Sequence, residues 1–283
     1  MLKQRVITAL VLLAILLPAL FSSQLAYWWG LCVFLMAAGA WEWGRLNAQD
    51  QTVSVLLAAL CALACVWSWD AGWIQAPHRE LWVGLSLFWL VGGSALLKAG
   101  PEAWSRSPAV FRLPLGLVVL WGTWLAVAQA RAVGINFLLS AMVLVWAADV
   151  AAYFAGRGLG GRFIARKLAV TISPGKTWEG ALGGAAGVLA LAALWPVLDR
   201  TLPVDSLSLF SRLLAASPVY LVSGALGLCA MSVVGDLIES LVKRSAGMKD
   251  SSGLLPGHGG VLDRVDALLP TMPMAMMLYA WTL

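Results

Sequence analysis

The strongest constraint on the fold is a series of long apolar segments separated by short polar connections. A helix needs about 20 mostly apolar residues to cross the hydrocarbon layer of a membrane. Nine segments approach this length: residues 6–22, 25–41, 53–69, 81–97, 113–130, 135–155, 180–198, 218–238 and 265–283. Only 12% of the residues are charged, too few to cover the surface of a soluble protein of this length. The sequence therefore predicts an all-α, polytopic integral membrane protein with about nine transmembrane helices.

The distribution of positive charge predicts how these helices are oriented. Cytoplasmic loops of membrane proteins carry an excess of Lys and Arg. With the N-terminus in the cytoplasm, 15 of the 19 Lys and Arg residues fall on the cytoplasmic side. A missed or extra helix would invert every later loop and spoil this ratio. We therefore expect nine spans and a cytoplasmic N-terminus.

The net charge of +5 then belongs mainly to the cytoplasmic face. A basic face attracts anionic lipid headgroups and nucleotides. Nucleic acid is not an expected partner, because the basic residues lie in separate loops at the membrane edge and form no soluble domain.

The chain divides into two regions of different character. Residues 1–112 are expected to form an N-terminal transmembrane anchor region, and residues 113–283 a catalytic transmembrane region. Nearly all the polar chemistry lies in the second region. In the first, the segment Trp41–Arg45 (WEWGR) could be a site or a membrane-edge anchor, and we favour the anchor because Trp is enriched at membrane interfaces.

A polar run between the last two apolar segments concentrates the charge of the chain. It extends from Ser240 to Asp266 and reads SLVKRSAGMKDSSGLLPGHGGVLDRVD. Its basic residues are Lys243, Arg244, Lys249 and Arg264, its acidic residues are Asp250, Asp263 and Asp266, and it contains His258. Cations and carboxylates gathered in this way are what phosphate and metal chemistry needs. We call residues 240–266 the signature run.

Carboxylates before and within the signature run are candidate magnesium ligands. On the preceding helix, Asp236, Glu239 and Lys243 share one face by their spacing, and Glu239 is expected to pair with Lys243. Asp263 and Asp266 lie one turn apart, so both can point into one site. Carboxylate oxygens together with water and phosphate suit Mg²⁺, whereas zinc would need more His or Cys ligands nearby.

Two further groups precede this helix in the sequence. Asp149 lies late in the sixth apolar segment, where a buried carboxylate is costly, and we favour a site role over a structural pair with an arginine. Residues 173–180 (SPGKTWEG) combine a glycine turn before a helix with Lys176, an arrangement that suits a phosphate. Thr177 could equally be a simple helix N-cap.

Together these segments resemble the signature of the phosphatidate cytidylyltransferases, also called CDP-diacylglycerol synthases. The signature run carries most of the resemblance, and family members have a similar S-P-x-K-T-x-E-G segment. The resemblance covers residues 145–270 strongly, while the first spans match only in type. It implies an enzyme that transfers a cytidylyl group from CTP to phosphatidate, giving CDP-diacylglycerol and pyrophosphate in phospholipid biosynthesis. It also implies dependence on Mg²⁺.

The resemblance implies roles for individual residues. Catalytic roles fall to Asp236, Lys249, His258 and Asp263. Substrate binding falls to Ser173, Lys176, Thr177, Lys243, Arg244, Gly259, Gly260 and Arg264. Magnesium would be held by Asp149, Asp236, Asp263 and Asp266. For His258, a general acid, a phosphate donor and a turn-stabilising role all stay open.

By the same resemblance, the expected partners are CTP, phosphatidate and membrane lipids, with a homodimer by family analogy. The site is expected to face the cytoplasm from a bacterial-type inner membrane. Two alternatives are another CTP-dependent lipid phospho- or nucleotidyltransferase and an anion transporter. Transporters usually show repeated halves, whereas this chain puts its polar chemistry in one half. A CDP-alcohol phosphotransferase is disfavoured because its D-G-x2-A-R pattern is missing.

Overall fold

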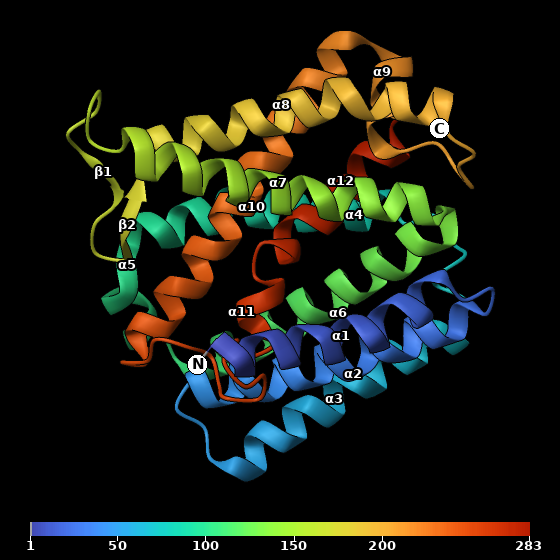
Figure 1. Ribbon diagram of the computed structural model, residues 1–283. Coiled ribbons are helices and arrows are strands. Elements are labelled where there is room, and N and C mark those ends of the chain that lie inside the picture. Colours follow the sequence, from blue (N-terminus) through green and yellow to red (C-terminus); the bar gives the residue numbers. More distant parts are fainter. Residues whose placement is uncertain (1) are drawn as a thin grey trace.

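The computed structural model describes residues 2–283, and nearly all of its regular structure is helical (Figure 1). The helices are α1 (Leu2–Phe21), α2 (Leu25–Leu46), α3 (Gln51–Asp70), α4 (Arg79–Leu87), the π-helical η1 (Phe88–Gly93), α5 (Ser94–Arg106), α6 (Ala109–Val133), α7 (Ile135–Leu159), α8 (Trp178–Thr201), α9 (Leu209–Ala216), α10 (Pro218–Ser245), α11 (Leu262–Val265) and α12 (Leu268–Ala280). Two short strands, β1 (Lys167–Ala169) and β2 (Ser173–Thr177), pair antiparallel between α7 and α8. The predicted all-α class is confirmed.

Eight helices within residues 2–283 are long and apolar enough to cross a membrane. They coincide with the first eight predicted segments, and α4, η1 and α5 together form the fourth, Arg79–Arg106. The ninth predicted segment, residues 265–283, is interrupted. There α11 ends at Val265 and α12 has only 13 residues.

The interruption before α12 has a local cause. Pro270 has no N–H to donate to the carbonyl of Asp266, so a continuous helix would lose a hydrogen bond at this point. The Asp266 side chain instead accepts a hydrogen bond from the backbone N–H of Ala267 at 2.7 Å. On α10, a Cβ at Gly235 would collide with the carbonyl oxygen of Asp266, so only glycine allows this approach. The break therefore brings Asp266 against α10.

Helices α7 and α8 run side by side through small residues (Figure 1). A Cβ added at Gly183 or Gly187 would collide with the side chains of Ala155 and Ala151 on α7. Small residues let membrane helices approach closely and gain van der Waals contact. This pair forms one wall of the site described below.

Helix α10 connects the two predicted regions of the chain. It packs against α5 of the first region and against α8, α9 and α12 of the second, while α2 packs against α6 and α11. Residues 1–112 therefore contribute to the walls around α10, and the division at residue 112 stays a prediction.

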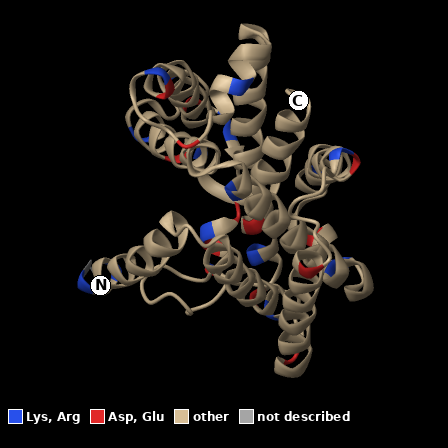
Figure 2. Ribbon diagram, turned by 90° about the vertical axis from the view of Figure 1, so that its right-hand side faces the viewer, with Lys and Arg blue, Asp and Glu red and all other residues tan. Residues whose placement is uncertain are grey.

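The beginning of α1 lies beside the signature run. The hydroxyl of Thr8 donates a hydrogen bond to the carbonyl oxygen of Pro256 at 2.8 Å. Most of the helical ribbon in Figure 2 carries no charged residue, and the charged residues lie in the middle of the view and at outer helix ends. The positive-charge pattern predicts both segments to be cytoplasmic, and they lie on one side of the molecule. Their orientation relative to a membrane stays a prediction.

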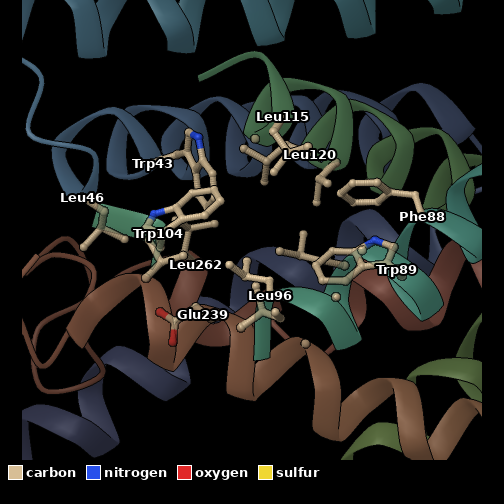
Figure 3. Close-up of a pocket in the computed structure, with 18 of the residues that line it drawn as sticks. Trp43, Leu46, Phe88, Trp89, Leu96, Trp104, Leu115, Leu120, Glu239 and Leu262 are labelled. Carbon is tan, nitrogen blue, oxygen red and sulfur yellow. The ribbon is translucent and has the colours of Figure 1, made fainter. Parts of the chain in front are cut away.

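An apolar cavity of about 230 Å³ lies between α2, η1, α5, α6 and α10 (Figure 3). Aromatic and aliphatic side chains form most of its wall, among them Trp43, Phe88, Trp89, Trp104, Leu115 and Leu120. Glu239 is the one charged residue among the described residues that line it. Because Glu239 lies near the end of α10, the cavity reaches the polar part of the molecule.

Candidate functional site

The signature run leaves the end of α10 and returns to it through a compact loop. Residues 246–261 turn back on themselves, with the N–H of Leu255 bonded to the carbonyl of Gly259 at 2.8 Å. Gly259 has φ +80°, a conformation that side chains disfavour, and it leads the chain into α11. The loop thereby brings α11 beside the side chain of Lys243.

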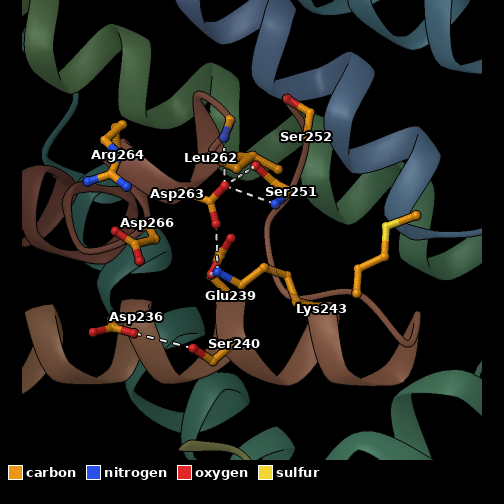
Figure 4. Close-up of polar contacts among 12 residues, drawn as sticks. Asp236, Glu239, Ser240, Lys243, Ser251, Ser252, Leu262, Asp263, Arg264 and Asp266 are labelled. Carbon is orange, nitrogen blue, oxygen red and sulfur yellow. Dashed lines mark hydrogen bonds and ion pairs between the residues drawn. The ribbon is translucent and has the colours of Figure 1, made fainter. Parts of the chain in front are cut away.

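Asp263 is the centre of this arrangement (Figure 4). Its Oδ2 atom accepts hydrogen bonds from the backbone N–H and hydroxyl of Ser251, at 2.9 and 2.8 Å, and from the N–H of Gly260 at 2.7 Å. Its Oδ1 atom accepts one from Lys243 Nζ at 2.6 Å. Burial alone would raise the pKa of Asp263, but the hydrogen bonds from Lys243, Gly260 and Ser251 hold that pKa down at about 2. Asp263 is therefore a fixed carboxylate.

Lys243 joins two carboxylates. Its ammonium lies 2.5 Å from Glu239 Oε2 and 2.6 Å from Asp263 Oδ1. The side chains of Lys243, Glu239 and Asp263 are 12%, 5% and 6% exposed. The predicted pairing of Glu239 with Lys243 is confirmed, and this pair is buried rather than solvated at the helix end.

A second group of charges lies about one turn earlier on α10. Lys176 Nζ forms an ion pair with Asp236 Oδ2 at 2.5 Å. Both residues line a cavity of about 580 Å³ between α7, α8, β2 and α10, and Asp149 and Tyr153 line it from α7. Asp149, Lys176 and Asp236, to which the resemblance gives site roles, therefore line one cavity.

Asp266 lies between these two groups. Figure 4 shows it on the same side of the Lys243–Asp263 pair as Asp236. Burial, and then the nearby charge of Asp236, raise the pKa of Asp266 to about 7. Asp266 and Asp236 are therefore close enough for each carboxylate to feel the charge of the other.

Residues 173–177 form strand β2, although the sequence indicated a glycine turn before a helix. Ser173 pairs with Ala169 of β1, and Lys176 extends toward Asp236. The Thr177 hydroxyl accepts a hydrogen bond from the N–H of Gly180 at 3.1 Å, so Thr177 is the N-cap of α8, as its alternative interpretation stated. The strand thus delivers Lys176 to the cavity, and Thr177 starts the helix that bounds it.

The remaining predicted residues lie at the rim. Lys249 is exposed and forms no ion pair among residues 2–283, and Arg244 reaches the carbonyl oxygens of Ile172 and Met248. The guanidinium of Arg264 donates to the carbonyl oxygen of His258 at 2.9 and 2.6 Å. His258 therefore holds Arg264 through its backbone carbonyl, and the role of its imidazole stays a prediction.

Glu42 contacts the signature run, and the sequence interpretation missed this contact. The anchor interpretation of Trp41–Arg45 is wrong for Glu42, whose side chain is fully buried and contacts the signature run. It lies near a span end, where a charged residue ordinarily reaches water. The signal that could have found it is the one that singled out Asp149, a carboxylate inside an apolar segment.

The predicted magnesium ligands are compatible with a divalent cation in their chemistry. No three His, Cys, Asp or Glu side chains in residues 2–283 lie close enough together to form a ready metal site. Two of the predicted carboxylates are instead paired with lysines, Asp236 with Lys176 and Asp263 with Lys243. Mg²⁺ is commonly bound by one or two carboxylates together with substrate phosphates. These residues therefore fit a cation that arrives with a nucleotide.

Comparison with known proteins assigns the chain to a family. The model described as "Cytidylyltransferase family" matches residues 3–282. A phosphatidate cytidylyltransferase of Pseudomonas aeruginosa is 39% identical over 99% of this chain and 98% of its own length. Those of Haemophilus influenzae and Staphylococcus epidermidis are 33% and 31% identical, over 100% and 99% of this chain and the whole of each relative. The chain belongs to the cytidylyltransferase family.

Proposed function

We propose that this protein transfers the cytidylyl group of CTP to phosphatidate, forming CDP-diacylglycerol and pyrophosphate. The observation that carries the proposal is the convergence of two lysine–carboxylate pairs, Lys176–Asp236 and Lys243–Asp263, around α10 in a chain of this family. The full-length relatives named above bear the name of this activity. The signature run therefore forms only part of the proposed site, and β2 and α10 supply the Lys176–Asp236 pair.

The reaction suits residues of this kind. A phosphate oxygen of phosphatidate forms a bond to the α-phosphorus of CTP, and the bond from that phosphorus to the β-phosphate oxygen breaks, releasing pyrophosphate. The attacking oxygen is already ionised, so no strong base is needed. Lys176 and Lys243 neutralise phosphate charge, with Arg244, Lys249 and Arg264 at the rim available for the triphosphate.

The proposal includes magnesium. Asp236, Asp263 and Asp266 would hold it, with Asp149 on the facing helix, and a bound Mg²⁺ would neutralise charge on the phosphates of CTP. Each lysine of the two pairs would then be free to turn from its carboxylate toward a phosphate. The exposed position of Lys249 leaves it a role in binding the triphosphate rather than in proton transfer.

The membrane setting follows from the same proposal. The protein is an integral membrane protein, and we place its site on the cytoplasmic side of an inner membrane, where CTP is available. A homodimer is part of the proposal by family analogy. Phosphatidate would reach the site from the bilayer that surrounds the helices.

We assign the apolar cavity of Figure 3 to an acyl chain of phosphatidate. Its lining comes from both halves of the chain. About 230 Å³ is below the usual volume of a small-molecule pocket, about 300–1,000 Å³, so it suits part of an alkyl chain. Glu239 places the end of this cavity beside Lys243, where the lipid phosphate would lie.

Gly92→Leu is expected to change the preference for chain length. Gly92 lines the cavity, and a Cβ there would meet only the ring of Phe88, at an ordinary contact distance of 3.5 Å. The leucine side chain would fill space that a long acyl chain needs. We expect kcat/KM for dioleoyl phosphatidate to fall about tenfold relative to dioctanoyl phosphatidate, because each excluded methylene costs a hydrophobic contact. Initial rates with both lipids in mixed micelles give this ratio.

Gly84→Leu is the matched control for this cavity. Gly84 lies on α4 in the same membrane segment, is exposed, and has open space at its Cβ position. Its ratio of the two rates is expected to equal that of the unaltered protein. If Gly92→Leu lowers kcat/KM equally for both lipids, or for neither, the assignment of this cavity to an acyl chain is wrong.

One assay tests the proposed function. Purified protein in detergent, given phosphatidate, Mg²⁺ and labelled CTP, is expected to release pyrophosphate and form a labelled lipid. Replacing phosphatidate by diacylglycerol separates this activity from that of another lipid phosphotransferase. Flux of anions into vesicles without any labelled lipid would instead favour a transporter, and failure with every phosphatidate tested would overturn the proposal.

A further inference from the structure

Glu42 links α2 to the signature run. Its carboxylate accepts hydrogen bonds from the Ser252 hydroxyl at 2.5 Å, the Val261 N–H at 2.9 Å and the Leu262 N–H at 2.7 Å. The Ser251 hydroxyl lies at 3.2 Å and donates more closely to Asp263, at 2.8 Å. Glu42 is 0% exposed. No Lys or Arg of the described chain forms an ion pair with this carboxylate.

A buried carboxylate without a cation is stable only when hydrogen-bond donors replace the water that it has lost. Here two of the donors are the N–H groups of Val261 and Leu262, at the start of α11. The first N–H groups of a helix lack partners within it, and Val261 provides no side-chain cap for α11. Glu42 therefore caps α11 from a helix about 220 positions earlier in the chain.

Two carboxylates together fix the loop from Ser251 to Leu262, whose Ser251 and Ser252 are drawn in Figure 4. Asp263 holds Ser251 and Gly260, while Glu42 holds Ser252, Val261 and Leu262. Gly260 lies between them, and a Cβ there would collide with the Ser251 hydroxyl and a Glu42 oxygen. Lack of space for a side chain therefore explains a glycine at this position.

We propose that Glu42 is a positioning residue for the reaction. By fixing the loop and the first turn of α11, it sets the place of Asp263 and, through Asp263, of the Lys243 ammonium. Glu42 itself is enclosed by the loop and is fully buried, so it acts through the loop. This inference rests on the proposed function and extends the site to the first region of the chain.

Glu42→Gln tests the proposal. The amide keeps the size of the side chain but loses the charge and turns an N–H₂ group toward backbone N–H donors. We expect kcat per folded molecule to fall about 10²-fold, since small displacements of a reacting group cost about this much. The KM for CTP should change less than kcat, because Lys176 lies on β2 and Arg244 on α10, outside the loop that Glu42 fixes. Rates are measured well below the unfolding temperature of each variant.

Asp199→Asn is the matched control. Asp199 accepts hydrogen bonds from Asn136, from the N–H and hydroxyl of Ser208 and from the hydroxyl of Ser211, a comparable number of donors, and none of these residues belongs to the site. It is expected to lower the unfolding temperature and leave kcat within about twofold. An equal loss of kcat in both variants would mean that Glu42 only stabilises the fold.

Ser252→Ala serves if Glu42→Gln does not fold. It deletes one donor and leaves the carboxylate in place, so kcat is expected to fall about threefold to tenfold, the effect of one hydrogen bond. Wild-type kcat in Glu42→Gln, or in Ser252→Ala where the first variant is unfolded, would overturn the inference. An inactive unaltered protein would instead overturn the proposed function, so the two failures are distinct.

Discussion

Removal of divalent cations is expected to abolish formation of the nucleotide lipid, and Asp236→Asn is expected to raise the Mg²⁺ concentration needed for half-maximal rate. Asp236 faces the cavity with Asp149 and lies near the half-buried carboxyl of Asp266. Metal ions contribute several kcal/mol to reactions of this class, so their loss reduces the rate by about 10³-fold or more. The rate is measured after chelation, and then as a titration with Mg²⁺ for each variant.

The titration separates two roles of Asp236. If the carboxylate binds a cation, the half-maximal Mg²⁺ concentration rises and excess Mg²⁺ recovers part of the rate. If it only holds Lys176, the maximal rate changes and the midpoint does not. Asp50→Asn is the control, because Asp50 is exposed and its side chain caps α3 through the N–H of Val53 at 2.8 Å. Full activity in chelator, or an unchanged titration of Asp236→Asn, would contradict the cation site.

Much of the fold was predictable because lipid imposes a simple rule on sequence. Spans must be apolar over about 20 residues, and eight helices of the structure match the predicted ranges. The broken ninth segment shows the limit of this rule. Hydropathy averages over Asp266 and Pro270, whereas the backbone responds to each of them, and the close approach at Gly235 depends on a helix distant in sequence.

Within the site, local spacing predicted one contact and could not predict others. Glu239 and Lys243 are one helical turn apart, so their pairing follows from the sequence. The pairing of Lys176 with Asp236 joins a strand to a helix 60 residues later, and Glu42 reaches Leu262 across 220 positions. Such contacts depend on how helices pack, which a single sequence does not encode as a repeated pattern.

Replacement of Lys243 is expected to lower both the stability and the activity of the protein. Its ammonium is the cation between Glu239 and Asp263, and all three side chains are nearly buried. Beyond this ion pair, neither oxygen of Glu239 has a hydrogen-bond partner in the described chain. Lys243→Met would leave two neighbouring carboxylates without a cation, which costs about 3–5 kcal/mol of folding free energy. We expect this destabilisation together with a loss of activity of about 10³-fold or more, since the phosphate-neutralising charge is lost as well.

The double variant Glu239→Gln with Lys243→Met separates stability from activity. Lys243→Met is expected to lower the unfolding temperature measured in detergent. Removing the charge of Glu239 as well should reverse most of that decrease, because one uncompensated carboxylate is gone. Activity should stay as low as in Lys243→Met, since the ammonium itself acts on phosphate. Arg106→Met is the control: its i,i+4 pair with Glu102 is 81% and 85% exposed and worth at most about 0.5 kcal/mol. Recovery of activity in the double variant would show that Lys243 serves the fold alone.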